Sequence, residues 1–233
     1  MRTRAPGGKK KEVTIRKLLA ATALTVALTE TYRRCWREPV LSWGATREEA
    51  TRGLPGDALL EHAAILSTRA VTIDAPVSAV WPWLVQMGPG RGGVYTYDWI
   101  ENLLGMDVHS VDRIIPGLQQ LQAGDAFPLK PGSLELRVEI LEPEHVLSLR
   151  SDDGRWVWTF ELVERDGSTR LISRNRIAMG GSSLGERLGM FVMEPGSLVM
   201  ERKMLLGIKQ RAERLAAEPR PTEEEVRSGA LAA

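Results

Sequence analysis

Hydrophobic and polar residues alternate over several short stretches, most of them in the second half of the chain. With a period of two, residues of one kind fall on one face of a strand, so each stretch predicts a half-buried β-strand. The predicted strands are 68–74, 125–129, 134–141, 146–150, 155–163 and 169–178. Two turn sequences between them, Asp152-Asp153-Gly154 and Asp166-Gly167, favour hairpins. The later strands are therefore predicted to form an antiparallel meander.

Apolar residues at helical spacing predict helices over 12–37, 77–87, 99–104 and 198–217. Pro39 is predicted to end the first helix, Asp98 to cap the third and Ser197 to cap the fourth. A capping box of Thr46 and Glu49 predicts one more short helix. The apolar stripe of the long last helix consists of Leu198, Met204, Leu205, Ile208, Ala212 and Leu215.

The predicted sheet has one apolar, aromatic face and one charged face. Period-two spacing places four residues of one strand on the same face: Trp156, Trp158, Phe160 and Leu162. An apolar face must be covered, and the stripe of the last helix can cover it. Ser173 and Asn175 would then point inward among aromatic rings. Buried polar groups need partners, so these two are candidates for orienting a ligand; the alternative is bonding to backbone or to a trapped water.

Together these elements predict an α+β domain over 68–217, with an antiparallel β-sheet wrapped around a long C-terminal α-helix. A basic N-terminal arm (1–37) and a connector (38–67) precede it, and a tail (218–233) that we expect to be disordered follows it. The chain has 233 residues, 43% of them hydrophobic and 26% charged, which is typical of a globular protein. Its one cysteine, Cys35, excludes an internal disulfide framework.

Charge is distributed unevenly along the chain. Residues 1–37 contain ten Lys or Arg and two Glu, a net +8, so the remainder of this +1 chain has a net charge of −7. Such an arm is typical of a segment that meets an anionic surface, and a solvated leader is the alternative. The domain has no basic stripe, so we expect no nucleic-acid partner.

An uncharged run at 18–29 lies within this arm. Its twelve residues are fewer than the roughly 20 that cross a bilayer. Three interpretations stay open: a cytoplasmic helix packed on the domain, a membrane-associated anchor, and an export signal. We expect a cytoplasmic protein, with membrane association through residues 1–37 as the alternative.

A glycine-rich loop follows the second predicted helix. Gly88, Gly90 and Gly93 match the dinucleotide fingerprint by spacing, but they follow a helix rather than a strand, so we expect no nucleotide and no other cofactor. We predict a mobile flap at a cavity mouth with Arg91 at its tip; close packing by the glycines is the competing interpretation. Four aromatic residues near the flap are candidate ligand contacts or core residues: Trp81, Tyr95, Tyr97 and Trp99.

Four segments resemble a known family. The order of elements resembles the helix-grip fold of the START/Bet v 1-like superfamily, also called SRPBCC. The segments 72–76 (TIDAP) and 80–84 (VWPWL) are similar to the opening of polyketide cyclase/dehydrase-like members. The segments 86–102 and 201–208 (ERKMLLGI) resemble an uncharacterised bacterial group of that superfamily. The resemblance covers roughly 68–216 and implies a cavity between sheet and helix that binds apolar small molecules.

Three functions follow from this reading. The first is binding of a hydrophobic small molecule, such as a lipid, an isoprenoid or a polyketide-like compound. The second is an enzyme of the cyclase/dehydratase kind in the same cavity, and the third is a membrane-tethered interaction protein. The resemblance implies no catalytic residue, and His109 with Asp107 and Asp112 has too few ligands nearby to predict a metal site. The expected ligand contacts add Trp156, Trp158, Phe160, Ser173 and Asn175 to Arg91 and the four aromatics.

Overall fold

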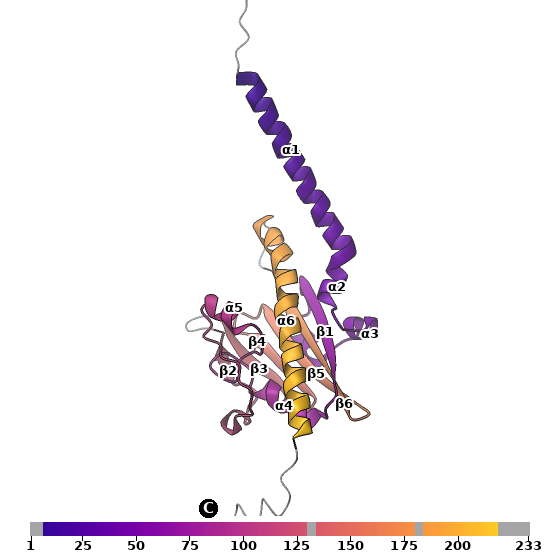
Figure 1. Cartoon of the computed structure of the whole chain (residues 1–233), viewed down its shortest axis with the longest axis vertical. Coiled ribbons are helices and arrows are strands. Elements are labelled where there is room, and N and C mark those ends of the chain that lie inside the picture. Colours follow the sequence, from indigo (N-terminus) through magenta and orange to yellow (C-terminus); the bar gives the residue numbers. More distant parts are fainter. Residues whose placement is uncertain (1–6, 130–133, 180–183, 219–233) are drawn as a thin grey trace, which may run out of the picture.

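Six antiparallel strands form one sheet in the order β1-β6-β5-β4-β3-β2 (Figure 1). The computed structural model describes residues 7–129, 134–179 and 184–218. The strands are β1 Ile65–Ile73, β2 Ala126–Pro128, β3 Glu135–Glu142, β4 Val146–Ser151, β5 Trp156–Arg165 and β6 Ser168–Ile177. The predicted tail and the start of the arm lie largely outside the described residues.

Six α-helices and three short helices of other kinds accompany this sheet in the described residues. The α-helices are α1 Gly7–Thr31, α2 Arg37–Leu41, α3 Arg47–Thr51, α4 Val77–Val85, α5 Asp98–Leu103 and α6 Leu184–Ala217. The others are the π-helix η1 Tyr32–Trp36 and the 3₁₀-helices η2 Pro55–Leu59 and η3 Pro116–Leu118. The predicted capping box of α3 is confirmed, because Thr46 and Glu49 each bond the other's backbone N–H.

The hairpin between β5 and β6 shows how local sequence sets the register. Arg165 faces Ser168 across a two-residue turn. Asp166 and Gly167 both have positive φ angles, 46° and 80°, as a type I′ turn requires. This register places Phe160 opposite Ser173 and Trp158 opposite Asn175. The predicted hairpin is therefore confirmed, and it aligns the residues of the aromatic face.

Helix α6 runs across the aromatic face of the sheet (Figure 1). Phe160, Leu162 and Leu171 from the strands join four fully buried residues of α6 in one core: Met204, Leu205, Ile208 and Ala212. The chain therefore has the α+β helix-grip fold, as predicted.

Helix α6 begins earlier than predicted. It starts at Leu184 and includes Pro195, so Ser197 lies inside the helix and does not cap it. The Ser197 hydroxyl donates to the Glu194 carbonyl at 2.8 Å and accepts a bond from Arg69 at 3.0 Å. Arg69 bonds Ser197 after Pro195 and Arg37 bonds Glu194 before it, so contacts from other elements hold the helix on both sides of a proline whose missing N–H would otherwise favour a break.

The other face of the sheet is covered over β6 by the connector. Arg174 is only 1% exposed, and its guanidinium donates to the Asp57 carboxylate, the Thr68 hydroxyl and backbone carbonyls of the connector. The Arg170 guanidinium donates to both carboxylate oxygens of Glu49, which also belongs to the connector. The charged face predicted for the sheet is therefore largely enclosed here, because its arginines bind the connector instead of water.

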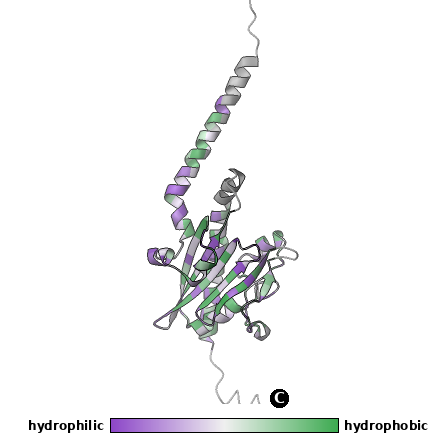
Figure 2. Ribbon diagram, turned by 180° about the vertical axis from the view of Figure 1, so that it is seen from behind, coloured by the Kyte–Doolittle hydropathy of each residue, from purple (hydrophilic) through white to green (hydrophobic). Residues whose placement is uncertain are grey.

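The N-terminal arm leads away from the sheet (Figure 1). Four apolar side chains lie exposed along α1: Leu19, Leu24, Val26 and Leu28. Figure 2 shows a hydrophobic stretch in this helix, with more hydrophilic residues at its base. Pro39 does not end the helical segment, which continues to Leu41, because Pro39 lies in the first turn of α2 where a missing N–H costs little. In the described residues, no helix is long and apolar enough to cross a membrane.

Candidate functional site

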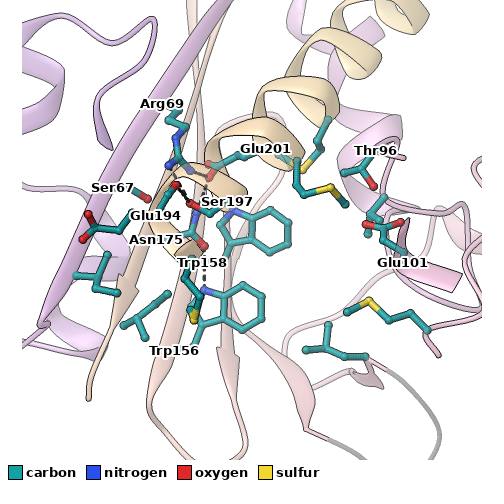
Figure 3. Close-up of a pocket in the computed structure, with 18 of the residues that line it drawn as sticks. Ser67, Arg69, Thr96, Glu101, Trp156, Trp158, Asn175, Glu194, Ser197 and Glu201 are labelled. Atoms are coloured by element: carbon teal, nitrogen blue, oxygen red, sulfur yellow. Dashed lines mark hydrogen bonds and ion pairs between the residues drawn. The ribbon is translucent and has the colours of Figure 1, made fainter. Parts of the chain in front are cut away.

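A cavity of about 300 Å³ lies between the sheet and α6 (Figure 3). Two tryptophans of β5 and four methionines make up much of its apolar wall: Trp156, Trp158, Met106, Met193, Met200 and Met204. Methionine side chains adapt their shape easily and suit a site that receives an apolar molecule.

The two indoles are fixed in place by hydrogen bonds from their ring N–H groups. Trp156 Nε1 donates to the Asn175 side-chain oxygen at 2.8 Å, and Trp158 Nε1 donates to the Ser173 hydroxyl at 2.9 Å. Their rings stack with centroids 5.6 Å apart and planes 20° from parallel. Because both N–H groups already have partners, the tryptophans contribute ring surface rather than hydrogen bonds to the cavity.

An ion pair on the same wall holds these partners in place. The Glu201 carboxylate pairs with the fully buried Arg69, and it accepts hydrogen bonds from Ser173 at 2.6 Å and Asn175 at 3.1 Å. Burial raises the pKa of the Glu201 carboxyl, and the Arg69 charge opposes that rise. Arg69 also donates to the Val40 carbonyl, so every arm of its guanidinium has a partner.

The base of the N-terminal arm contacts this wall of the cavity at Glu194. Arg37 binds the Glu194 carboxylate with bonds of 2.8 and 3.0 Å, and Tyr32 donates its hydroxyl at 3.1 Å. Burial raises the pKa of Tyr32 to about 12, and the bond to Glu194 adds to the rise. The arm and the cavity therefore share one hydrogen-bonded network.

The opposite wall contains a carboxylate that has no such partner. Glu101 of α5 is 6% exposed and, like Thr96, lines the cavity (Figure 3). Glu101 Oε2 and Thr96 Oγ1 are both buried without a hydrogen bond among the described residues. Burial raises the pKa of Glu101, the nearby Thr96 hydroxyl opposes that rise, and the neighbouring charge of Asp98 adds to it. Asp98 does not cap α5 as predicted, because its carboxylate binds Ser110 instead.

Three of the predicted ligand contacts line the cavity, namely Trp156, Trp158 and Asn175. Ser173 lies directly behind them, bonded to Trp158 and Glu201. Phe160 is fully buried in the core beside Trp158 and is not a lining residue.

The predicted aromatics near the glycine loop are not among the residues that line the cavity. Tyr95 is buried, and its hydroxyl donates to the Trp83 carbonyl at 3.1 Å. Trp81 is half-buried against the core, Tyr97 lies below Lys203, and Trp99 is 68% exposed.

The glycine loop is tightly packed, which supports the competing interpretation over the mobile flap. Gly88 and Gly93 bond each other across it at 3.0 and 3.1 Å. A Cβ on Gly92 would lie 2.9 Å from the Gln86 carbonyl oxygen, and one on Gly93 would lie 2.5 Å from Ser110 Cα. Arg91 does not extend from a tip, because it donates to the carbonyls of Val85 and Leu118.

Seven polar residues that line the cavity were absent from the predicted site: Ser67, Arg69, Thr96, Glu101, Glu194, Ser197 and Glu201. Two of them leave a signal in the pattern, since Arg69 is in phase with Val71 and Ile73 of its strand and Glu201 is in phase with Met204 and Leu205 of its helix. A charged residue in phase with an apolar stripe indicates a buried charge that needs a partner. Thr96 lies in a loop and Glu101 in a short helix. Neither segment is long enough for a hydrophobic pattern to show which side chains are buried.

No family model and no curated protein matches the chain. Solved structures similar to it include a protein from Mesorhizobium loti, with 20% identity, a TM-score of 0.37, and coverage of 63% of this chain and 97% of that chain. A polyketide cyclase-like protein from Corynebacterium glutamicum has 14% identity, a TM-score of 0.32, and coverage of 65% and 89%. An AHSA1-like protein from Aeromonas hydrophila has 16% identity, a TM-score of 0.33, and coverage of 66% and 99%.

Proposed function

We propose that the protein binds a hydrophobic small molecule, such as a lipid, an isoprenoid or a polyketide-like compound, in the cavity between the sheet and α6. The observation that supports this most is the pair of stacked indoles whose N–H groups are already bonded to protein side chains. Together with the methionines, they form an apolar wall of the kind on which small molecules bind.

Two neighbouring residues of α6 provide the test. Met200 lines the cavity, whereas Val199 is exposed. Met200→Trp should fill the cavity and reduce the binding of an environment-sensitive apolar dye such as ANS by about tenfold or more, since each buried CH₂-sized contact contributes about 0.8 kcal/mol. Val199→Trp is the matched control and should bind as the wild type does. Native mass spectrometry should show a co-purified apolar molecule on the wild type and not on Met200→Trp; equal dye affinity in all three proteins would refute the proposal.

Glu101 supports an enzymatic alternative. A buried carboxyl facing an apolar cavity can act as a general acid or base, as a cyclase or dehydratase would need. The other two carboxylates of the cavity already pair with arginines, Glu201 with Arg69 and Glu194 with Arg37. This alternative requires that the protein convert a bound polyketide-like compound and that Glu101→Gln abolish the conversion while keeping the binding.

We also propose that residues 1–37 contact an anionic membrane surface. Exposed apolar side chains of α1 lie between basic residues, and each basic residue near such a surface contributes about 1 kcal/mol. Replacing Leu19, Leu24 and Leu28 together by Gln should reduce sedimentation with phosphatidylserine vesicles and leave the melting temperature unchanged, because these side chains are exposed. Unchanged sedimentation of this variant would contradict the proposal.

A further inference from the structure

The charges around the cavity balance except at one residue. Four charged side chains line it, namely Arg69, Glu101, Glu194 and Glu201. Glu201 pairs with Arg69, and Glu194 pairs with Arg37 at 2.8 Å. In the part of the chain that the structure describes, Glu101 has no cation within ion-pair distance. The cavity is therefore short of one positive charge, and the deficit is at Glu101.

Thr96 is the one neighbouring group that favours the charged form of Glu101, but it leaves Glu101 Oε2 without a hydrogen-bond partner in the described residues. Thr96 faces the same part of the cavity, and its hydroxyl oxygen is likewise buried without a hydrogen-bond partner (Figure 3). Among the described residues, the charge that acts on Glu101 is the negative carboxylate of Asp98, which is itself bonded to Ser110. A buried carboxylate without a partner is costly, whereas a hydrogen-bonded cation beside it would remove most of that cost.

The donors of the opposite wall cannot move over to Glu101. The guanidinium of Arg69 is fully used by Val40, Ser197 and Glu201. The side-chain amide of Asn175 is used by Trp156 and Glu201. A bound molecule is therefore the available source of a donor at Glu101.

We propose that the ligand is an apolar amine whose protonated nitrogen binds Glu101 and Thr96 while its hydrocarbon body lies on the indoles and methionines. This inference rests on the proposed function and specifies the ligand's polar group. A carboxylic acid of the same length would place a second negative charge beside Glu101 and should be rejected. The charge that selects the ligand is thus negative, whereas a flap with Arg91 at its tip would present a positive one.

Three probes of one chain length test this: decylamine, decanol and decanoate, measured by calorimetry on the full chain. Wild type should bind decylamine about tenfold or more tightly than decanol, because a hydrogen bond to a charged group is worth more than a neutral one. Glu101→Gln should abolish that preference, so that decylamine and decanol bind with similar affinity. Asp107→Asn, which removes an exposed carboxylate outside the cavity, should keep it.

A second variant tests the same subsite in case Glu101→Gln does not fold. Thr96→Val keeps the shape of the side chain and should lower decylamine affinity by a few-fold without changing that of decanol. Equal binding of decylamine and decanol to wild type, or an amine preference that survives in Glu101→Gln, would overturn the amine subsite alone. Failure of all three probes to bind would overturn the proposed function with it.

Discussion

At the scale of single residues, the main energetic feature is the buried pair of Arg69 and Glu201. Neither side chain reaches bulk water to any extent, and each has further hydrogen bonds on the wall of the cavity. Removing one partner of such a pair leaves an uncompensated buried charge, whereas replacing both removes the problem.

Glu201→Ala should therefore lower the free energy of unfolding by about 3–5 kcal/mol. The double variant Arg69→Met with Glu201→Leu should recover much of that loss, because no unpaired charge stays buried. Urea unfolding followed by circular dichroism measures both. If the double variant were less stable than Glu201→Ala, the charge of Arg69 would not be the cause.

Single residues also show the limit of sequence-based prediction at the site. Trp156, Trp158 and Asn175 were predicted because strand periodicity alone decides which face they occupy. Glu101 could not be predicted, since the cavity that it lines is assembled from strands and helices far apart in the sequence. The sequence predicts Arg91 at the tip of a flap, yet Arg91 donates to the carbonyls of Val85 and Leu118, and no local pattern indicates such acceptors.

At the scale of elements, the connector is fitted closely to the back of the sheet. Gly56 of η2 is buried, and a Cβ placed there would overlap the Thr159 and Ser148 hydroxyls of β5 and β4. Those two hydroxyls bond each other at 2.9 Å. Gly53 lies in the same connector with no atom near the position of a Cβ.

Gly56→Ala should destabilise the protein by about 1–3 kcal/mol, because the added methyl overpacks the contact. Gly53→Ala is the matched control and should change stability by less than about 0.5 kcal/mol. Thermal unfolding of the two variants compares them directly. Equal melting temperatures would show that the connector is not held against the sheet.

Helix α3 is joined to β6 by a pair that depends on pH. The hydrogen bond from Arg170 lowers the pKa of Glu49 to about 2. Since this value is below that of the unfolded chain, the stabilisation is complete above about pH 4.5 and is lost as the pH falls toward about 2. Its size is at most about 3 kcal/mol.

Wild type should therefore lose more stability between about pH 5 and about pH 3 than Glu49→Gln does. Glu48→Gln alters an exposed residue of the same helix and should follow the wild type. Urea midpoints at each pH provide the measurement. Parallel curves for wild type and Glu49→Gln would contradict the role of this pair.

The elements themselves were predicted to different degrees. The hairpins were predicted well because their turn residues are local signals, as Asp166 and Gly167 show. The start of α6 was misplaced, because long-range bonds to Glu194 and Ser197 outweigh the local effect of Pro195. The cover over β6 was missed, because Arg174 finds its acceptors more than a hundred residues earlier in the chain.

At the scale of the whole molecule, the arm and the ligand cavity are connected. Arg37 and Tyr32 at the base of the arm bind Glu194, which lines the cavity. The Glu194 carbonyl accepts from Ser197, and Ser197 in turn binds Arg69. A displacement of the arm at a membrane surface would therefore act on the wall that faces the ligand.

The stacked tryptophans have an optical consequence. Two indoles held 5.6 Å apart and nearly parallel have coupled transition dipoles, which give a paired positive and negative band in circular dichroism. The coupling depends steeply on distance and angle, and both are set by the bonds to Asn175 and Ser173. A molecule that shifts either ring on entering the cavity would change that band. The protein thus contains its own chromophore for following occupancy, without a label.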